Sequence, residues 1–231
     1  VQLGIGGPKK DMNILMTLNN NGQAITLSKK LADKGAVDGP GLAKLMQKEK
    51  RDYTFAQTFP TGTHAMWLYY WLAAHGINPM KDTKVITVPP PQMVANMRVD
   101  NMEGYCVGEP WNGVAAAQNI GFTHIATQDI WKNHPEKALV VNAHFAATEK
   151  ENLKKVMKAV IEACKWLDNM GNRKKAAGWL TKPNYVNAPL QVLEARLAGS
   201  YDLGCELGVQ KYKDDGMMFY NNGIVNMPRK S

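Results

Sequence analysis

The sequence predicts an α/β protein built on a largely parallel sheet, and three observations support this prediction. Short apolar runs typical of strands alternate with helix-like stretches between residues 53 and 131. Hydrophobic residues make up 45% of the 231 residues and charged residues 21%, which is ordinary for a globular domain. Glycine or proline follows most of the runs and marks turns. Strands and helices that alternate at this spacing form βαβ units, whose strands lie parallel.

The first quarter of the chain predicts a loop and two helices. Residues 1–13 are rich in glycine and predict a loop. Residues 14–35 predict a helix, because Asn19–Gly22 supplies capping residues, apolar side chains follow them and Gly35 can end the helix. Residues 39–50 predict a second, shorter helix.

The middle of the chain predicts four strands that are followed by turns and helices. The strands are expected at 53–59, 84–88, 104–107 and 123–127. The helices are expected at 64–75, 92–99 and 112–120. Ligands of parallel sheets bind beyond the C-terminal ends of the strands. This rule directs attention to residues 60–64, 89–92 and 108–112.

The last third predicts a strand at 138–141 and helices, with little chemistry. The helix at 149–170 has the clearest helical period, and Thr148 with Glu151 matches a capping box. Further helices are expected at 173–181 and 189–198.

The predicted elements fit two lobes joined by crossings near 36–52 and 130–137. Residues 1–52 would hold the end of lobe one and a crossing segment, residues 53–131 lobe two, and residues 132–231 a helix-rich return to lobe one.

Composition and motifs exclude several classes of function. The net charge of +8 favours anionic partners, but the basic residues are scattered in pairs and form no arginine-rich stripe for nucleic acid. The three cysteines show no CxxC spacing, and the five histidines no metal-ligand pairing. We find no GxSxG, HExxH or Walker A motif. We therefore expect that the protein is not an enzyme and that it binds neither a cofactor nor a metal ion.

One turn predicts an anion site. Gly62, Thr63 and His64 lie between a predicted strand and a predicted helix, where backbone N–H groups and the helix dipole attract an anion. Glycine lets the backbone approach closely, and His64 would point from the first helical turn. The alternative interpretation is that His64 only caps the helix or packs against neighbouring side chains. Gln23 follows Asn19–Gly22 in a similar position, and its alternative is a solvated polar residue.

Two charged residues are weaker candidates. Lys137 lies just before the strand at 138–141, where a lysine is usually solvated. Glu109 lies at a strand's C-terminal end, where it either faces a ligand or caps the following helix. The aromatic cluster in the helix at 64–75 is interpreted as packing. Its members are Trp67, Tyr69, Tyr70 and Trp71.

Several long motifs resemble the nitrate-binding proteins of nitrate/nitrite ABC transporters. The motifs are LNNNGQAITLS at 18–28, FPTGTHAMWLYYW at 59–71, ITVPPPQMV at 86–94, CVGEPWN at 106–112, HPEK at 134–137 and, more weakly, PRKS at 228–231. The resemblance implies a type II periplasmic-binding-protein fold with two lobes, in which the N-terminal part of lobe one lies outside this chain. It also implies that Gln23, His64 and Lys137 contact the anion, with Gly62 and Thr63 in the adjoining turn and Glu109 near the same cleft.

The resemblance further implies a carrier that binds nitrate or nitrite in the interlobe cleft and delivers it to the permease and ATPase subunits of an importer. It places such a protein in the periplasm, anchored to the inner membrane by a lipid outside this chain. Bicarbonate-binding relatives carry an acidic residue in place of Lys137. A bicarbonate binder and a cytoplasmic nitrate sensor of the same fold remain alternatives. Thiamine-pyrimidine synthases share the fold but carry a cysteine-rich run, which this sequence lacks.

Overall fold

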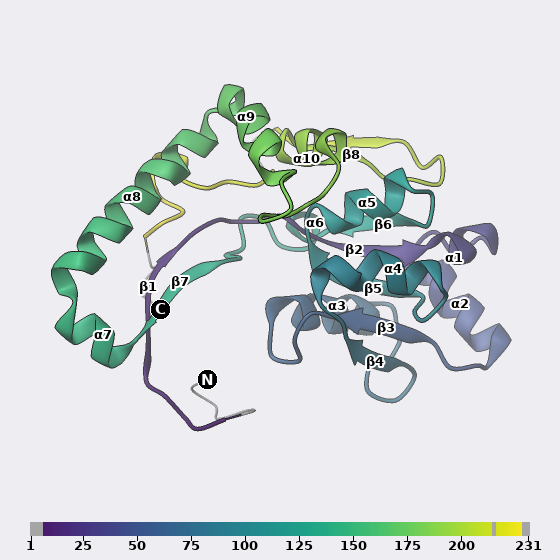
Figure 1. The fold of residues 1–231 in the computed structure, drawn as a ribbon. Helices are drawn as coiled ribbons and strands as arrows, with labels where there is room; N and C mark the ends of the chain where they lie inside the picture. The colour runs from purple at the N-terminus through teal and green to yellow at the C-terminus, as the bar shows by residue number, and fades with distance from the viewer. Residues whose placement is uncertain (1–6, 214–215, 228–231) are drawn as a thin grey trace. The chain divides into compact units, whose positions relative to one another are not determined.

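The computed structural model describes residues 7–213 and 216–227, so the PRKS motif at the end lies outside the described residues. The chain divides into two compact units. Unit 1 comprises Val1–Asn21, Asn133–Ala176 and Met217–Ser231. Unit 2 comprises Gly22–Lys132 and Ala177–Gly216. The elements are labelled along the chain in Figure 1.

Unit 2 is built on a five-stranded mixed sheet with the order β4-β3-β5-β2-β6 (Figure 1). The strands are β2 (Gln23–Ser28), β3 (Thr54–Gln57), β4 (Lys84–Thr87), β5 (Gly104–Gly108) and β6 (Gly121–Ala126). The pairs β3–β4 and β3–β5 are parallel, whereas β2 runs antiparallel to both β5 and β6. Four strands therefore run one way and β2 runs against them, which confirms a parallel-rich sheet.

Helices follow the strands of unit 2. Those near 39–50, 64–75, 92–99, 112–120 and 189–198 were predicted, whereas the short helices at 29–33 and 127–130 were not. The helices are α1 (Lys29–Asp33), α2 (Gly39–Glu49), α3 (Thr63–Ala74), the 3-10 turn η1 (Pro90–Gln92), α4 (Met93–Arg98), α5 (Trp111–Ala117), α6 (Thr127–Ile130) and α10 (Leu190–Leu197). A small hairpin of β8 (Ser200–Asp202) and β9 (Val209–Lys211) follows α10.

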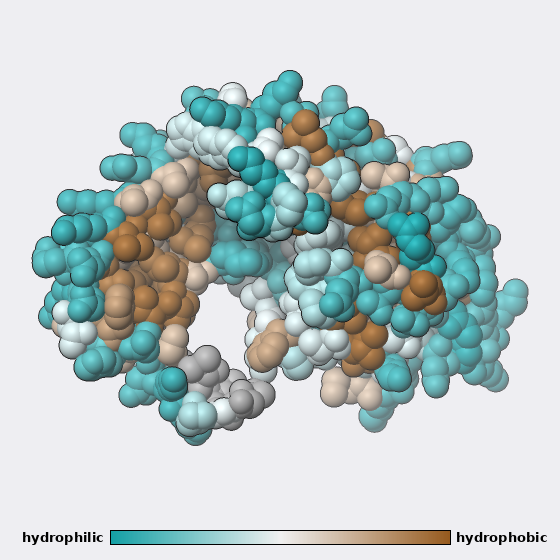
Figure 2. Space-filling model, in the orientation of Figure 1, coloured by the Kyte–Doolittle hydropathy of each residue, from teal (hydrophilic) through white to brown (hydrophobic). Residues whose placement is uncertain are grey.

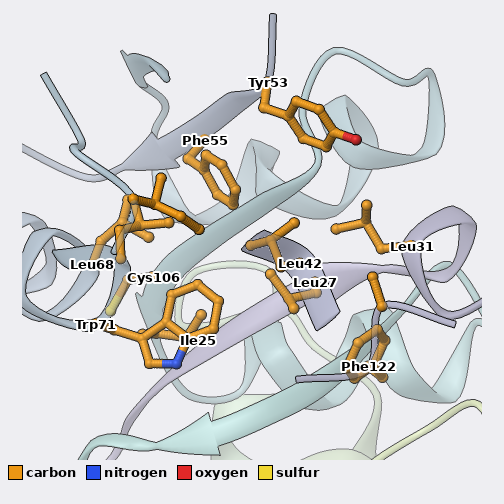
Figure 3. Packing of buried hydrophobic residues seen from close by; sticks show 13 residues of the cluster. Ile25, Leu27, Leu31, Leu42, Tyr53, Phe55, Leu68, Trp71, Cys106 and Phe122 are labelled. Carbon is orange, nitrogen blue, oxygen red and sulfur yellow. The ribbon is translucent and has the colours of Figure 1, made fainter. Parts of the chain in front are cut away.

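The core of unit 2 lies between the sheet and the helices α1, α2 and α3 (Figure 3). Ile25 and Leu27 of β2 contribute to the same buried cluster as Phe55 of β3 and Leu68 and Trp71 of α3. Burial of each such side chain stabilises the fold by roughly 1.5–3 kcal/mol. This cluster anchors α3 on the sheet and so places the first turn of α3.

Unit 1 contains an antiparallel ribbon and two helices of very different length. The ribbon pairs β1 (Met12–Thr17) with β7 (Ala138–Asn142), and the helices are α7 (Ala143–Thr148) and α8 (Lys150–Asp168). Helix α9 (Met170–Leu180) begins in unit 1 and ends in unit 2, and η2 (Asn221–Gly223) lies near the C-terminus. An apolar pocket of about 650 Å³ is lined by Leu15, Met157, Ile161 and Ile224, among others. Apolar surface on this side of α8 is visible in Figure 2.

The carboxylate of Asp168 holds the C-terminal part of unit 1 against the end of α8. It accepts hydrogen bonds from the backbone N–H groups of Phe219, Tyr220 and Asn221 at 2.8, 2.8 and 2.6 Å. Arg173 Nη2 lies 3.2 Å from the same carboxylate. One acidic side chain therefore fixes three consecutive backbone donors.

Two local predictions were wrong. Residues 14–35 form two strands and a short helix instead of one long helix. The side chains of β2 are all buried, so its apolar residues lack the alternation of a half-exposed strand. The capping box is absent, because the α8 N-cap is Glu149 and the Thr148 hydroxyl donates to the carbonyl of His144.

The division into units also differs from the expected lobes. The first boundary falls at Asn21 and Gly22, so α2 belongs to unit 2 and is not part of a crossing. The segment Ala177–Gly216 also joins unit 2, because α10 and β8 pack on α5.

We predict that Asp168→Ala loosens the segment at 217–221 while unit 2 keeps its fold. Hydrogen bonds to a charged group each contribute roughly 1.5–3 kcal/mol. The amides of residues 219–221 should then exchange with deuterium at least tenfold faster. The matched control is Glu151→Gln, whose carboxylate only meets exposed Lys154. Unchanged exchange in Asp168→Ala would contradict this account.

Candidate functional site

One edge of the unit 2 sheet brings together four of the six predicted site residues, which are Gln23, Gly62, Thr63 and His64. Because β2 runs against its neighbours, its first residue lies at the edge where β3, β5 and β6 end. Gln23 therefore starts a strand at this edge, and the expected helix start is wrong. The turn before α3 follows β3 at the same edge. This is the edge at which α/β sheets bind ligands.

Gln23 and Thr63 are in direct contact although 40 positions separate them. The Gln23 amide nitrogen Nε2 donates to Thr63 Oγ1 at 2.9 Å. The Thr127 hydroxyl donates to the Gln23 carbonyl at 3.0 Å, which fixes the backbone of the strand. Gln23 and Thr127 are both fully buried. The amide of Gln23 is therefore held in one place at the start of α3.

His64 lies in the first turn of α3 and is oriented by Thr58. The Thr58 hydroxyl lies 2.7 Å from His64 Nδ1, so the other ring nitrogen, Nε2, points elsewhere. A Cβ atom added to Gly108 would lie 3.9 Å from His64 Nε2, which places the end of β5 beside the ring. The Gly62 N–H donates to the Phe59 carbonyl at 3.0 Å and closes the turn. Gln23, Thr63, His64 and Gly108 thus form one cluster.

The carboxylate of Glu109 is engaged inside unit 2. Its Oε1 lies 3.2 Å from Arg196 Nη1, and the two side chains are 2% and 3% exposed. Burial raises the pKa of Glu109, and the charge of Arg196 partly opposes that shift. Only the backbone of Glu109 meets the site edge, where its N–H donates to the Gly22 carbonyl at 2.9 Å.

Arg196 links the segment at 177–216 to the sheet, and sequence reasoning missed it. Its guanidinium donates to Thr123 Oγ1 at 3.1 Å and to the Asp202 carbonyl at 2.8 Å, and it covers the ring of Tyr201. A side chain at Gly113 would collide with it, since an added Cβ would lie 2.5 Å from Arg196 Nε. No local motif around Arg196 marks it as buried.

Lys137 belongs to unit 1 and lies in an extended segment paired with residues 18–20. The Leu18 N–H donates to the Lys137 carbonyl at 2.7 Å, and the Lys137 N–H donates to Asn19 Oδ1 at 3.3 Å. The Lys137 side chain is 60% exposed, and its ammonium pairs with Glu136. The backbone is therefore fixed while the charge reaches solvent.

The aromatic residues of α3 are divided between core and surface. Trp71 is buried in the core cluster, as expected for packing. Trp67 makes an edge-on contact with Trp131, with ring centroids 6.3 Å apart. Tyr70 is 63% exposed, so packing within unit 2 does not explain why an aromatic side chain lies at this position.

Residues 7–213 and 216–227 contain neither a metal-binding cluster nor a membrane-spanning helix. No cluster of three or more His, Cys, Asp or Glu side chains in this part of the chain could hold a metal ion. No helix of the described residues is both long and apolar enough to cross a bilayer.

The parallel-rich sheet with polar groups at one edge places the chain among proteins with the fold of periplasmic solute-binding proteins. The structure superposes on the periplasmic nitrate-binding protein NrtA from Synechocystis PCC 6803 with a TM-score of 0.90. The two are 35% identical, over 96% of this chain and 58% of that one.

The chain belongs to the NMT1-like family, whose model matches residues 1–181. It is 38% identical to the nitrate/nitrite binding protein NrtA of Synechococcus elongatus over 95% of this chain. It is 29% identical to the bicarbonate-binding protein CmpA of the same species over 97% of this chain. The chain spans about half the length of these curated relatives, 50% and 51% respectively. The relatives are binding proteins, in agreement with the expectation that the chain is no enzyme.

We predict that Glu109→Leu destabilises unit 2 by about 3–5 kcal/mol, because it leaves the Arg196 charge buried without its carboxylate. The double variant Glu109→Leu with Arg196→Met should recover most of that loss. Denaturant unfolding of the intact protein measures both. As a control, Asp33→Asn breaks only the exposed pair with Lys29 and should change the free energy of unfolding by less than about 1 kcal/mol. A double variant as unstable as the single one would refute the role of the pair.

Proposed function

We propose that the chain is part of the solute-binding component of an ABC importer and that it binds nitrate or nitrite. The observation that carries this proposal is the cluster of Gln23, Thr63, His64 and Gly108 at the edge of the sheet. It is supported by the higher identity to a nitrate/nitrite binding protein than to a bicarbonate-binding protein. The permease and ATPase subunits of the importer are the proposed partners.

The chemistry of the cluster suits a small planar anion. Nitrate carries one negative charge on three acceptor oxygens and needs donors. An amide and an imidazole N–H are both donors, and the backbone at the start of α3 adds the positive end of a helix dipole. Following the family resemblance, Lys137 supplies the positive charge. Three hydrogen bonds to a charged group contribute roughly 1.5–3 kcal/mol each, which supports micromolar binding after the cost of association.

Glu109 has a different role in this proposal from the one that the sequence suggested. Its carboxylate lies against Arg196, so we propose that it positions the end of β5 and does not contact the anion. Gly62 and Thr63 remain in the proposal as the turn that places His64.

We further propose that the intact protein works in the periplasm, held at the inner membrane by a lipid anchor outside this chain.

A protein that binds bicarbonate is the second candidate function, because of the similarity to CmpA. Bicarbonate carries a hydroxyl donor that needs an acceptor, and a lysine ammonium offers none.

Isothermal titration of the intact protein that carries this chain tests the ligand. We expect micromolar nitrate binding, which Lys137→Glu should abolish. The control Lys154→Glu makes the same charge change at an exposed position of α8 and should leave the affinity within about twofold. Bicarbonate binding without nitrate binding would overturn the ligand assignment and leave the family intact.

A second titration tests the cluster in unit 2. Gly108→Ala adds a Cβ in ordinary contact distance of His64 Nε2, 3.9 Å away, so the fold should tolerate it. The methyl group takes space beside the ring, and we expect nitrate affinity to fall by about tenfold or more. Gly178→Ala is the control, because an added Cβ there meets no atom within 4 Å. Unchanged nitrate affinity in Gly108→Ala would remove this cluster from the site.

A further inference from the structure

Lys137 does not present an isolated charge. Its Nζ lies 2.5 Å from Glu136 Oε1 in an ion pair between sequence neighbours. The two side chains differ sharply in exposure, since Lys137 is 60% exposed and Glu136 only 5%. The carboxylate thus lies beneath the ammonium, on the protein side of the pair.

The backbone of the pair is held in place by Asn19. The Glu136 N–H donates to the Asn19 carbonyl at 3.0 Å, and the Lys137 N–H reaches Asn19 Oδ1. Asn19 is itself nearly buried, and its Nδ2 donates to the Asn21 carbonyl at 3.0 Å. The backbone that carries the carboxylate is therefore held in place by hydrogen bonds to Asn19.

This pair differs from the other lysine pair of unit 1. Lys154 and Glu151 lie on the outer face of α8 and are 66% and 78% exposed, so water screens both charges. A carboxylate that is 5% exposed is screened less by water and salt than an exposed one, so it acts more strongly on a neighbouring anion. An anion beside Lys137 would meet a cation and a fixed negative charge together.

We propose that Glu136 is a specificity-determining residue that restricts the anion site to singly charged ligands. It offsets part of the Lys137 charge and repels the bound anion. The repulsion grows in proportion to the charge of the anion. This inference rests on the proposed function, because it requires that Lys137 meets the anion.

Coulomb's law gives the proposal a quantitative signature. The repulsion energy is linear in the charge of the ligand, so removal of the carboxylate charge helps a dianion twice as much in free energy as a monoanion. The fold-change for the dianion is then the square of that for the monoanion. If Glu136→Gln tightens monoanion binding by roughly fivefold, it should tighten dianion binding by roughly 25-fold. A residue that only orients Lys137 would give the opposite sign, because its loss would weaken the binding of both anions and would weaken the dianion more.

The test titrates nitrate and sulfite into the intact protein at one ionic strength. Sulfite also presents three oxygens and is doubly charged at mildly alkaline pH; where its direct heat is too small, competition with nitrate gives its affinity. Glu136→Gln should bind both anions more tightly, with the larger gain for sulfite. Glu136→Asp keeps the charge and should keep the selectivity. The control Glu151→Gln should change neither affinity.

The outcomes separate this inference from the proposed function. Equal gains for both anions, weaker binding of both, or no change in Glu136→Gln would overturn the specificity role while nitrate binding by the unsubstituted protein stands. If Glu136→Gln is not folded at the assay temperature, Glu136→Ala replaces it in the titration. A selectivity for nitrate over sulfite that is as strong in Glu136→Ala as in Glu136→Asp would equally overturn the specificity role. Failure of the unsubstituted protein to bind nitrate would overturn the proposed function, and this inference would fall with it.

Discussion

The antiparallel course of β2 through an otherwise parallel sheet is the constraint on which the site depends. A strand that runs with its neighbours would bring Ser28, and not Gln23, to the edge where β3, β5 and β6 end. The reversed direction lets one edge combine the start of β2 with the ends of the four other strands. A one-residue slip of β2 would turn Ile25 and Leu27 away from the core cluster of unit 2 and put Ala24 and Thr26 in their place, so the packing favours this register. The Gln23–Thr63 contact follows from this arrangement.

The Glu109–Arg196 pair adds a second constraint, at a cost in solvation. Two charges that are almost fully buried stabilise a fold only where further hydrogen bonds satisfy them. Arg196 meets that condition through Thr123 and the Asp202 carbonyl. The pair joins a segment from late in the chain to the turn that follows β5. It therefore fixes the turn beside His64, although neither charge lies in the proposed contact set.

The sequence predicted the elements of the middle third well, because the strands there are short and most of them are followed closely by glycine or proline. It failed at β2, since a strand buried on both faces lacks alternation and its apolar spacing also fits a helix. The motif that contains Thr63 and His64 was found from the strand-to-helix turn. The Asp168 and Arg196 contacts could not be predicted, because each joins residues far apart in the chain and depends on tertiary packing.

The charge balance around Lys137 fits the demands on a carrier that must release its ligand. A lone ammonium would bind any anion and favour those of higher charge, because Coulomb attraction takes no account of shape. Selectivity for a weakly basic monoanion is better achieved by neutral donors at fixed positions, such as the amide of Gln23, together with a cation whose charge is partly offset. In the proposed site, the nearly buried carboxylate of Glu136 would provide that offset, and Asn19 holds the backbone of the segment that carries both residues. Different residues would then recognise the shape and the charge of the anion, so that either preference could change without the other.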